Sequence, residues 1–206
     1  MSKLKREFYT RNDVVEISKD LLGKVLVTNV NGIVTKAKIV ETEAYCGRND
    51  RAAHSFQKRT PRTEVMYNTG GKVYTYLCYG IHTLFNIVTN EKDLADAVLV
   101  RAVEPIENID AVLKRRNQST LKRIVSDGPG KVSKAMDISL DHYGLDLVDN
   151  DIFIEDHNIK IHDQEIMESH RVGVDYAGED ALRNWRFRVK GNPFIGKDYV
   201  AKVIVS

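Results

Sequence analysis

The stretch from Glu41 to His54 holds the most unusual set of polar side chains in the sequence. Alternate residues of a strand share one face, so Glu41, Glu43 and Tyr45 would lie together at the end of an apolar strand. Glu is a poor strand former, so two of them on one face need an explanation. Either the strand ends in solvent, or a carboxylate is held at a cleft with Tyr45 and His54 beside it. The segment alone leaves both explanations open.

Other reactive side chains form weaker patterns. Glu43, Cys46, His54 and Cys78 lack the paired spacing of a structural zinc site, and the sequence contains no His-Glu-x-x-His. It also contains no glycine-flanked serine elbow, phosphate-binding loop or dinucleotide fingerprint. We therefore expect no metal and no cofactor, and we interpret the two cysteines as free thiols.

Tyr79 is the second unusual residue, because it occupies a predicted turn between two strands. Such a turn would normally take Gly, Asn or Asp. An exposed aromatic side chain at a hairpin tip can insert between DNA bases as a wedge. Tyr74 and Tyr76 share one face of the preceding strand, a pattern that ordinary core packing also produces.

The elements that must position these residues are short helices and hairpin-forming strands. Asp13 ends a capping signature before a predicted helix over residues 14–22, which Gly23 stops. Asn31-Gly32 predicts a hairpin between strands 24–30 and 33–45, and its second arm carries Glu43. Further predicted strands span residues 73–77, 81–89, 97–103, 151–155, 158–162, 171–174 and 185–190, and Glu104-Pro105 ends the third of them. Two further helices are predicted. One spans residues 109–116, and the other follows the turn at 127–131 and continues through residue 136.

The composition indicates one globular domain over residues 1–206. Hydrophobic residues make up 42% and charged residues 29% of the chain, and no apolar run approaches the roughly 20 residues of a membrane span. We see no secretory signal, and two cysteines suit a reducing cytoplasm. Interspersed helices and hairpin-forming strands favour an α+β fold with a curved, antiparallel sheet.

The charge pattern leaves the partner open. A net charge of +2 does not by itself indicate nucleic acid binding. Local basic clusters occur at residues 58–62 and 114–123, and each is either a solvated face or a set of phosphate contacts.

Several ordered motifs resemble the alkyladenine (3-methyladenine) DNA glycosylase family. The matching segments are Glu-Thr-Glu-Ala-Tyr at 41–45, Ala-Ala-His-Ser at 52–55, Arg-Thr-Pro-Arg at 59–62, residues 73–82, Asn86, residues 98–105, Asp-Gly-Pro-Gly-Lys at 127–131 and Arg-Val-Gly-Val at 171–174. The resemblance extends from the first helix to Asn192-Pro193. It implies the mammalian-type glycosylase fold, a curved antiparallel sheet flanked by helices, with a protruding hairpin that inserts into DNA.

The resemblance also implies a role for each matched residue. Glu43 would be the general base that activates a water, which Arg101 and the main-chain carbonyl of Val172 would help to hold. Tyr45 and His54 would form one wall of a pocket for a flipped base. The remaining implied roles are Tyr76 for the opposite wall, Asn86 for the pocket edge that excludes guanine, Tyr79 with its apolar neighbour Ile81 for the DNA wedge, and Arg59, Arg62 and Lys131 for phosphate contacts.

These roles describe a base-excision repair enzyme that acts on double-stranded DNA with damaged purines. A base must leave the duplex before an enzyme's water can reach it. No Lys matches the catalytic position, so the resemblance implies a monofunctional enzyme without a Schiff-base step. We expect a monomer in a bacterial cytoplasm. The alternative is a catalytically silent protein that binds DNA lesions on the same fold.

The chain departs from the family pattern at both ends and in one loop. It has no long basic N-terminal extension, and the loop between His54 and Arg59 is short, which leaves the DNA role of Lys58 and Arg59 open. The tail at 198–206 has no assigned role, although Tyr199, Val200 and residues 203–205 could add a final strand.

Overall fold

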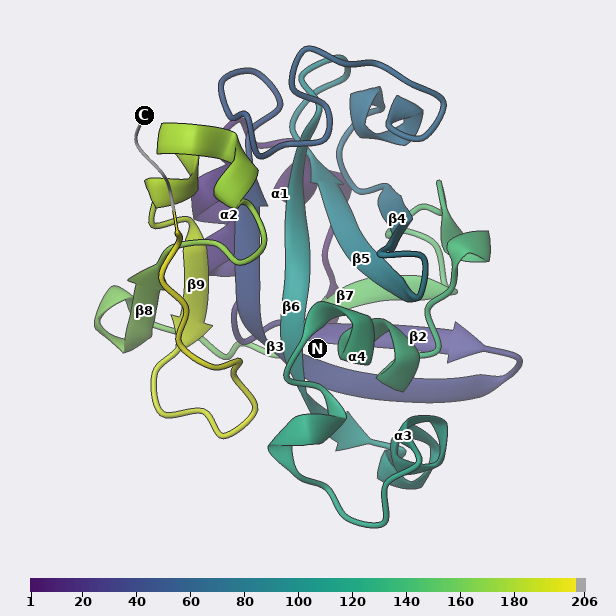
Figure 1. Ribbon diagram of the computed structural model, residues 1–206. Coiled ribbons are helices and arrows are strands. Elements are labelled where there is room, and N and C mark those ends of the chain that lie inside the picture. The colour runs from purple at the N-terminus through teal and green to yellow at the C-terminus, as the bar shows by residue number, and fades with distance from the viewer. Residues whose placement is uncertain (203–206) are drawn as a thin grey trace.

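The computed structural model describes residues 1–202, and its frame is a single sheet of nine strands in which every pairing is antiparallel (Figure 1). The strands are β1 (Ser2–Lys3), β2 (Val25–Val30), β3 (Ile33–Tyr45), β4 (Val73–Cys78), β5 (His82–Thr89), β6 (Asp96–Glu107), β7 (Ile152–Asp156), β8 (Ile166–Ser169) and β9 (Arg186–Val189). Their main order is β1-β7-β2-β3-β6-β5-β4. This architecture confirms the predicted α+β class.

Strand β3 is long enough to pair with two other strands along one edge. Its first half pairs with β2, and Glu41, Thr42 and Glu43 pair with β9, which in turn pairs with β8. Its other edge pairs with β6 along most of its length. The residues around Glu43 therefore lie between two strands rather than at a solvated strand end.

Four α-helices and five short 3-10 helices pack around the sheet. The α-helices are α1 (Arg6–Tyr9), α2 (Val14–Asp20), α3 (Ile109–Arg116) and α4 (Pro129–Ala135). The 3-10 helices span Glu64–Tyr67, Arg123–Val125, Leu140–His142, Asp163–Glu165 and Asp175–Leu182. Helices α2, α3 and α4 confirm the three predicted helices within one or two residues.

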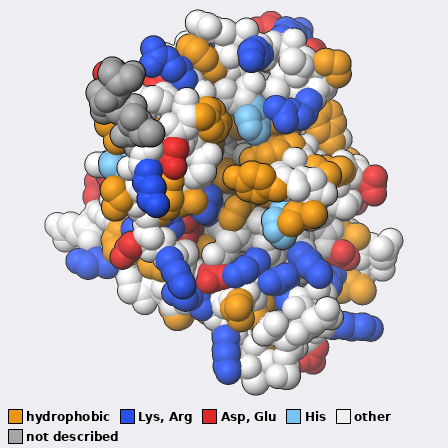
Figure 2. Space-filling view, in the orientation of Figure 1, with side chains coloured by type: hydrophobic (Ala, Val, Ile, Leu, Met, Phe, Trp, Pro, Cys, Tyr) orange, Lys and Arg blue, Asp and Glu red, His pale blue; other side chains and the backbone are white. Residues whose placement is uncertain are grey.

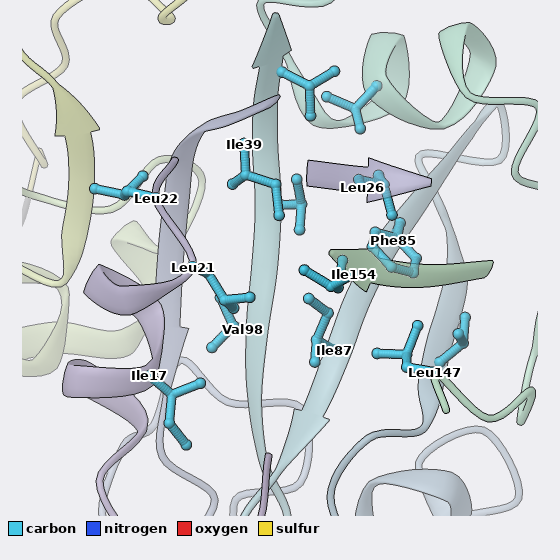
Figure 3. Close-up of a cluster of buried hydrophobic side chains, with 14 of the residues drawn as sticks. Ile17, Leu21, Leu22, Leu26, Ile39, Phe85, Ile87, Val98, Leu147 and Ile154 are labelled. Carbon is cyan, nitrogen blue, oxygen red and sulfur yellow. The ribbon is translucent and has the colours of Figure 1, made fainter. Parts of the chain in front are cut away.

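Helix α2 begins and packs as its sequence pattern predicts. The carboxylate of Asp13 accepts hydrogen bonds from the N–H groups of Val15 and Glu16, which lack partners within the helix. Ile17 and Leu21 point from α2 into the main hydrophobic core, beside Val98 of β6 (Figure 3). Burial of such side chains is the main source of stability, at about 1.5–3 kcal/mol for each.

Both predicted hairpins are confirmed. Asn31 and Gly32 have φ of 53° and 76° in the turn between β2 and β3. Tyr79 and Gly80 have φ of 50° and 72° in the turn between β4 and β5. A positive φ is easy for Gly and tolerated by Asn, but it strains a bulky residue such as Tyr.

An irregularity in the pairing of β3 with β6 lies beside the two glutamates. Glu41 pairs with Ala102 and Thr42 pairs with Val100, so Arg101 is an extra residue on β6. Bulges of this kind disrupt the ladder locally, bend the strand and re-aim a side chain. Here the bulge belongs to the residue whose guanidinium contacts Glu41 and Glu43.

Two predicted strands are wrong. Residues 158–162 form no strand, because both edges of β7 are already occupied by β1 and β2. Residues 171–174 also form no strand. The strand that pairs with β9 in this region is β8, which ends at Ser169, before residue 171.

Two predicted strand limits also need correction. Strand β6 continues through Pro105, where it pairs with β3 alone because its pairing with β5 ends at Leu99. A missing N–H is tolerated on such an open edge. In the tail, Tyr199 and Val200 form no strand, and the predicted strand residues 203–205 lie outside the described part of the chain.

Among residues 1–202, no helix has the length and apolar character that a membrane crossing requires.

The long segment between β3 and β4 carries His54 and is fixed at both ends by close backbone contacts. A Cβ atom on Gly47 would lie 2.4 Å from the carbonyl oxygen of Ala95. A Cβ atom on Gly70 would lie 2.4 Å from the carbonyl oxygen of Tyr9. Neither contact can relax without a backbone shift. The glycines therefore let the two ends of this segment approach the rest of the fold closely.

We predict that Gly70→Ala lowers the free energy of unfolding by about 1–3 kcal/mol, the usual cost of forcing extra volume into a packed site. Urea unfolding followed by circular dichroism measures the change. Gly128→Ala is the control, because a Cβ there would lie no closer than 3.9 Å to any neighbour. Equal stability of the two variants would contradict the close approach.

Candidate active site

The carboxylate of Glu43 is fully buried on β3 and receives three hydrogen bonds. The hydroxyl of Tyr45 donates to Oε2 at 2.7 Å, and Nη1 of Arg101 donates to the same oxygen at 3.3 Å. The main-chain N–H of Val172 donates to Oε1 at 2.7 Å. A carboxylate can accept about four hydrogen bonds, so Oε1 retains the capacity for one more donor.

Glu41 is also buried, so this strand does not end in solvent, which was one of the two explanations for its glutamates. It is 1% exposed, and its Oε1 accepts hydrogen bonds from Nε of Arg101 at 2.9 Å and Nε of Arg186 at 2.7 Å. Burial alone would raise the pKa of Glu41, but the two guanidinium groups beside it lower that pKa below its usual value. No sequence pattern pointed to Arg186, which lies 145 residues from Glu41.

The position of Val172 depends on its neighbour Arg171. The buried guanidinium of Arg171 binds both carboxylate oxygens of Asp50, at 2.5 Å from Nη1 and 2.8 Å from Nη2. It also donates to the main-chain carbonyl of Ala44 at 2.8 Å and lies 4.8 Å from the centre of the Tyr45 ring. These contacts explain why this segment is an irregular loop tied to β3 instead of the predicted strand.

A cavity of about 360 Å³ opens beside Glu43, within the size range of small-molecule sites. It is lined by Tyr45, Ala52, His54, Met66, Tyr74, Tyr76, Cys78, Tyr79, Leu84, Asn86, Ala97, Leu99, Arg101, Pro129, Val172, Gly173, Val174 and Tyr176. Glu43 lies behind this lining, in contact with three of its members. The face in Figure 2 shows a central hollow bordered by hydrophobic side chains, with Lys and Arg side chains around it.

The aromatic residues of the cavity contact one another. Nδ1 of His54 lies 2.9 Å from the hydroxyl of Tyr74, and the His54 ring meets the Tyr76 ring edge to face, with centres 4.6 Å apart. The rings of Tyr74 and Tyr76 are stacked 5.5 Å apart. His54 and Tyr76, which we predicted on opposite walls, are therefore in direct contact in this structure.

Asn86 is buried on β5, opposite Tyr74 of β4 and Leu99 of β6. Its side-chain amide donates to the main-chain carbonyl of Tyr74 at 3.1 Å. This bond fixes the orientation of the amide at the cavity lining.

Burial and the nearby positive charge of Arg62 lower the pKa of His54 to about 4. Burial likewise raises the pKa of Tyr74 to about 12. At neutral pH the cavity therefore presents uncharged aromatic rings.

Tyr79 and Ile81 project from the hairpin beside the cavity. Their exposed fractions are 88% and 73%, unusually high for large apolar side chains. Tyr79 also contributes to the cavity lining, which places the hairpin tip at the mouth of the cavity.

The three predicted phosphate contacts differ in their availability. Arg59 forms ion pairs with Glu64 and Asp93, and the ammonium of Lys131 lies 2.6 Å from a carboxylate oxygen of Asp127. Within residues 1–202, Arg62 pairs with no carboxylate. Of these three side chains, Arg62 is therefore the one that could bind an anion without first leaving a carboxylate.

The described residues contain no group of three or more His, Cys, Asp or Glu side chains that could hold a metal ion. Cys46 and Cys78 are free, as predicted.

Comparison with known proteins gives a consistent result. The family model described as methylpurine-DNA glycosylase matches residues 7–193. A relative from Clostridium novyi (strain NT) is 45% identical over 96% of this chain and 100% of its own length. A relative from Natranaerobius thermophilus is 45% identical over 94% of this chain and 98% of its own length. A relative from Clostridium perfringens (strain 13 / Type A) is 42% identical over 95% of this chain and 99% of its own length. All three carry the provisional name 3-methyladenine DNA glycosylase.

We predict that His54 titrates near pH 4 and that Arg62→Gln raises its pKa while leaving it below the usual 6.5, because burial is the larger cause. The histidine ring signals in an NMR titration measure both values. Since the folded-state pKa is the lower one, this group makes the protein less stable as pH falls from about 6.5 to 4.

Arg11→Gln is the control for this titration, because Arg11 pairs with Asp20 on another part of the surface. A wild-type His54 that titrates near 6.5 would contradict the prediction.

Proposed function

The chain belongs to the methylpurine-DNA glycosylase family, and from this we propose that it hydrolyses the N-glycosidic bond of alkylated or deaminated purines in double-stranded DNA. The damaged nucleotide is flipped out of the duplex, its base enters the aromatic cavity, and hydrolysis leaves an abasic site. The observation that carries this proposal is a buried carboxylate, held by Arg101 and the Val172 N–H, directly behind a cavity lined by uncharged aromatic rings.

In this proposal Glu43 activates the attacking water. Its Oε1 retains the capacity for one further hydrogen bond, which suits a water that is also held by Arg101 and the Val172 carbonyl. The negative charge of the carboxylate would also stabilise an oxocarbenium-like transition state at the sugar. The water loses its proton to Glu43 as its oxygen bonds to the sugar carbon, and the electron pair of the broken N-glycosidic bond leaves with the base. This electron pair neutralises the positive charge of an alkylated purine, whereas a neutral deaminated purine also takes up a proton from solvent as it departs.

The cavity suits a base that carries positive charge, as N-alkylated purines do. Electron-rich aromatic faces attract a cation, by about 2 kcal/mol or more where water is excluded. A neutral His54 avoids the repulsion that an imidazolium would add. Because the positive charge makes the base a good leaving group, one carboxylate is enough where ordinary glycoside hydrolysis uses two.

Entry of a base requires His54 and Tyr76 to separate. A base between two rings needs a van der Waals contact on each face, so the rings must lie roughly 7–8 Å apart. Their centres are now 4.6 Å apart. We propose that the base then lies between Tyr76 on one side and Tyr45 with His54 on the other, and that Asn86 excludes the exocyclic amine of guanine.

The hairpin and the basic side chains complete the proposed DNA contact. Tyr79, with Ile81 beside it, fills the gap that the flipped nucleotide leaves in the duplex. Arg62 contacts a phosphate, whereas Arg59 and Lys131 must first exchange their carboxylate partners. No Lys lines the cavity among the described residues, which supports a monofunctional hydrolase. We further propose that the protein acts as a monomer.

We predict that wild-type protein releases free base from duplexes containing hypoxanthine or ethenoadenine, and that Glu43→Gln slows release by at least about 100-fold while retaining lesion binding. Chromatography of the released base measures the rate. The same duplex without the lesion is the control.

Wild-type protein that leaves every damaged duplex intact would exclude the enzymatic proposal and favour a catalytically silent lesion-binding protein. Strand cleavage without added alkali would contradict the monofunctional assignment.

We also predict that Tyr79→Ala weakens binding to damaged duplex by about 1–3 kcal/mol, the usual value of one base–aromatic stack. Fluorescence anisotropy with a labelled duplex measures this change. Ile33→Ala, a partly exposed apolar residue at the tip of the other hairpin, is the matched control. Unchanged affinity of Tyr79→Ala would show that the tip does not stack in the duplex.

A further inference from the structure

Glu41 accepts three hydrogen bonds although it does not line the cavity. Its Oε1 lies between Nε of Arg101 at 2.9 Å and Nε of Arg186 at 2.7 Å. Its Oε2 accepts a hydrogen bond from the main-chain N–H of Gly196 at 2.6 Å. Charge-assisted bonds of this kind are the strong ones in proteins and fix geometry as well as energy.

The guanidinium of Arg101 therefore bridges the two carboxylates of β3. Its Nε faces Glu41, and its Nη1 faces Glu43. A planar guanidinium held at two of its nitrogens by two carboxylates cannot rotate without breaking one contact. The position of Arg101 relative to Glu43 is thus set in part by Glu41.

The segment 194–198 binds the carboxylate oxygen of Glu41 that Arg101 does not contact, and it lies beyond the part of the chain that the family model matches. Gly196 supplies the N–H on Oε2, and the carbonyl of Lys197 accepts a hydrogen bond from Nη2 of Arg186 at 2.9 Å. The packing is tight, because a Cβ on Gly196 would lie 3.0 Å from Oε2 of Glu41.

The same segment continues to the loop that carries Val172. The Tyr199 hydroxyl donates to the carboxylate of Asp175 at 2.7–2.8 Å, three residues after Val172. Figure 1 shows this yellow C-terminal segment running back along β9 toward the short helix at 175–182. The C-terminal segment thus contacts Glu41, which binds Arg101, and Asp175 in the loop that carries Val172.

We propose that Glu41 is a positioning residue for the reaction, and that Gly196 in the C-terminal segment completes its site by fixing the carboxylate that holds Arg101 against Glu43. This inference rests on the proposed function, in which Glu43 activates water. Glu41 touches neither the base nor the water, and it acts only through Arg101.

A purely structural ion pair would have a different signature. It would change the folded fraction but leave the rate of base release per folded molecule unchanged. A positioning residue changes that rate and leaves lesion affinity unchanged, because Tyr79 and the aromatic cavity supply the binding contacts.

The test measures single-turnover base release at saturating protein, lesion-duplex affinity and folded fraction for wild type, Glu41→Gln and Gly196→Ala. Glu41→Gln removes the negative charge. Gly196→Ala adds a Cβ atom 3.0 Å from Oε2 of Glu41, which displaces the carboxylate, and it requires no strained backbone conformation. We expect release to slow at least about tenfold for Glu41→Gln, as is typical when a supporting partner of a reactive group is lost, and several-fold for Gly196→Ala. Lesion affinity should stay within about twofold of wild type for both.

Two control variants test the same region without touching this network. Thr42→Val removes a buried hydrogen bond to the Ser18 carbonyl on the opposite face of the same strand. Lys38→Gln removes a partly exposed ion pair of the same strand with Glu104. Both should release base at the wild-type rate.

The outcomes separate this inference from the proposed function. Wild-type rates in Gly196→Ala, and in Glu41→Gln where it folds, would overturn the inference alone. An equal slowing by Thr42→Val would overturn it too, since general loosening of the strand would then explain the effect. A wild-type protein that releases no base would overturn both proposals.

Discussion

The site depends on one ion-pair network inside the sheet, in which Arg101 lies between Glu41 and Glu43. A charge removed from water loses several kcal/mol of solvation, so three such groups are tolerated only when each has well-placed partners. One of those partners, Tyr45, lies on the same strand as the glutamates, and the others come from distant parts of the chain, namely the Val172 N–H, Arg186 and the Gly196 N–H. Removing one partner from a buried pair typically costs about 3–5 kcal/mol, so the network constrains the fold as much as the chemistry.

Local sequence patterns predicted much of this fold correctly. Asp13 as a helix cap and Asn31-Gly32 as a hairpin turn act through contacts within a few residues, and both are confirmed. The two wrong strands failed for a non-local reason. An apolar run becomes a strand only if a sheet edge is free, and residues 158–162 have no free edge at β7, whereas Arg171 ties its segment to Asp50.

The site was predictable where motif and geometry coincide, and less so elsewhere. The structure brings Glu43, Arg101, Val172 and the predicted cavity residues together, although their functional roles remain predictions. The sequence did not show that Glu41 is buried, because its partner Arg186 is distant and only the β6 bulge aims Arg101 at both glutamates. It also could not show that Glu64 and Asp93 neutralise Arg59.

The contact between Gly196 and Glu41 spans 155 residues and has a consequence for the growing chain. Proteins are synthesised from the N-terminus, so β3 and β6 leave the ribosome long before residue 196. Contacts between distant residues also form late, because closing a long loop costs more entropy than closing a short one. An unfinished chain can thus acquire most of its sheet while its two glutamates and Arg101 still lack a partner, so the site is completed only after residue 196 has been synthesised.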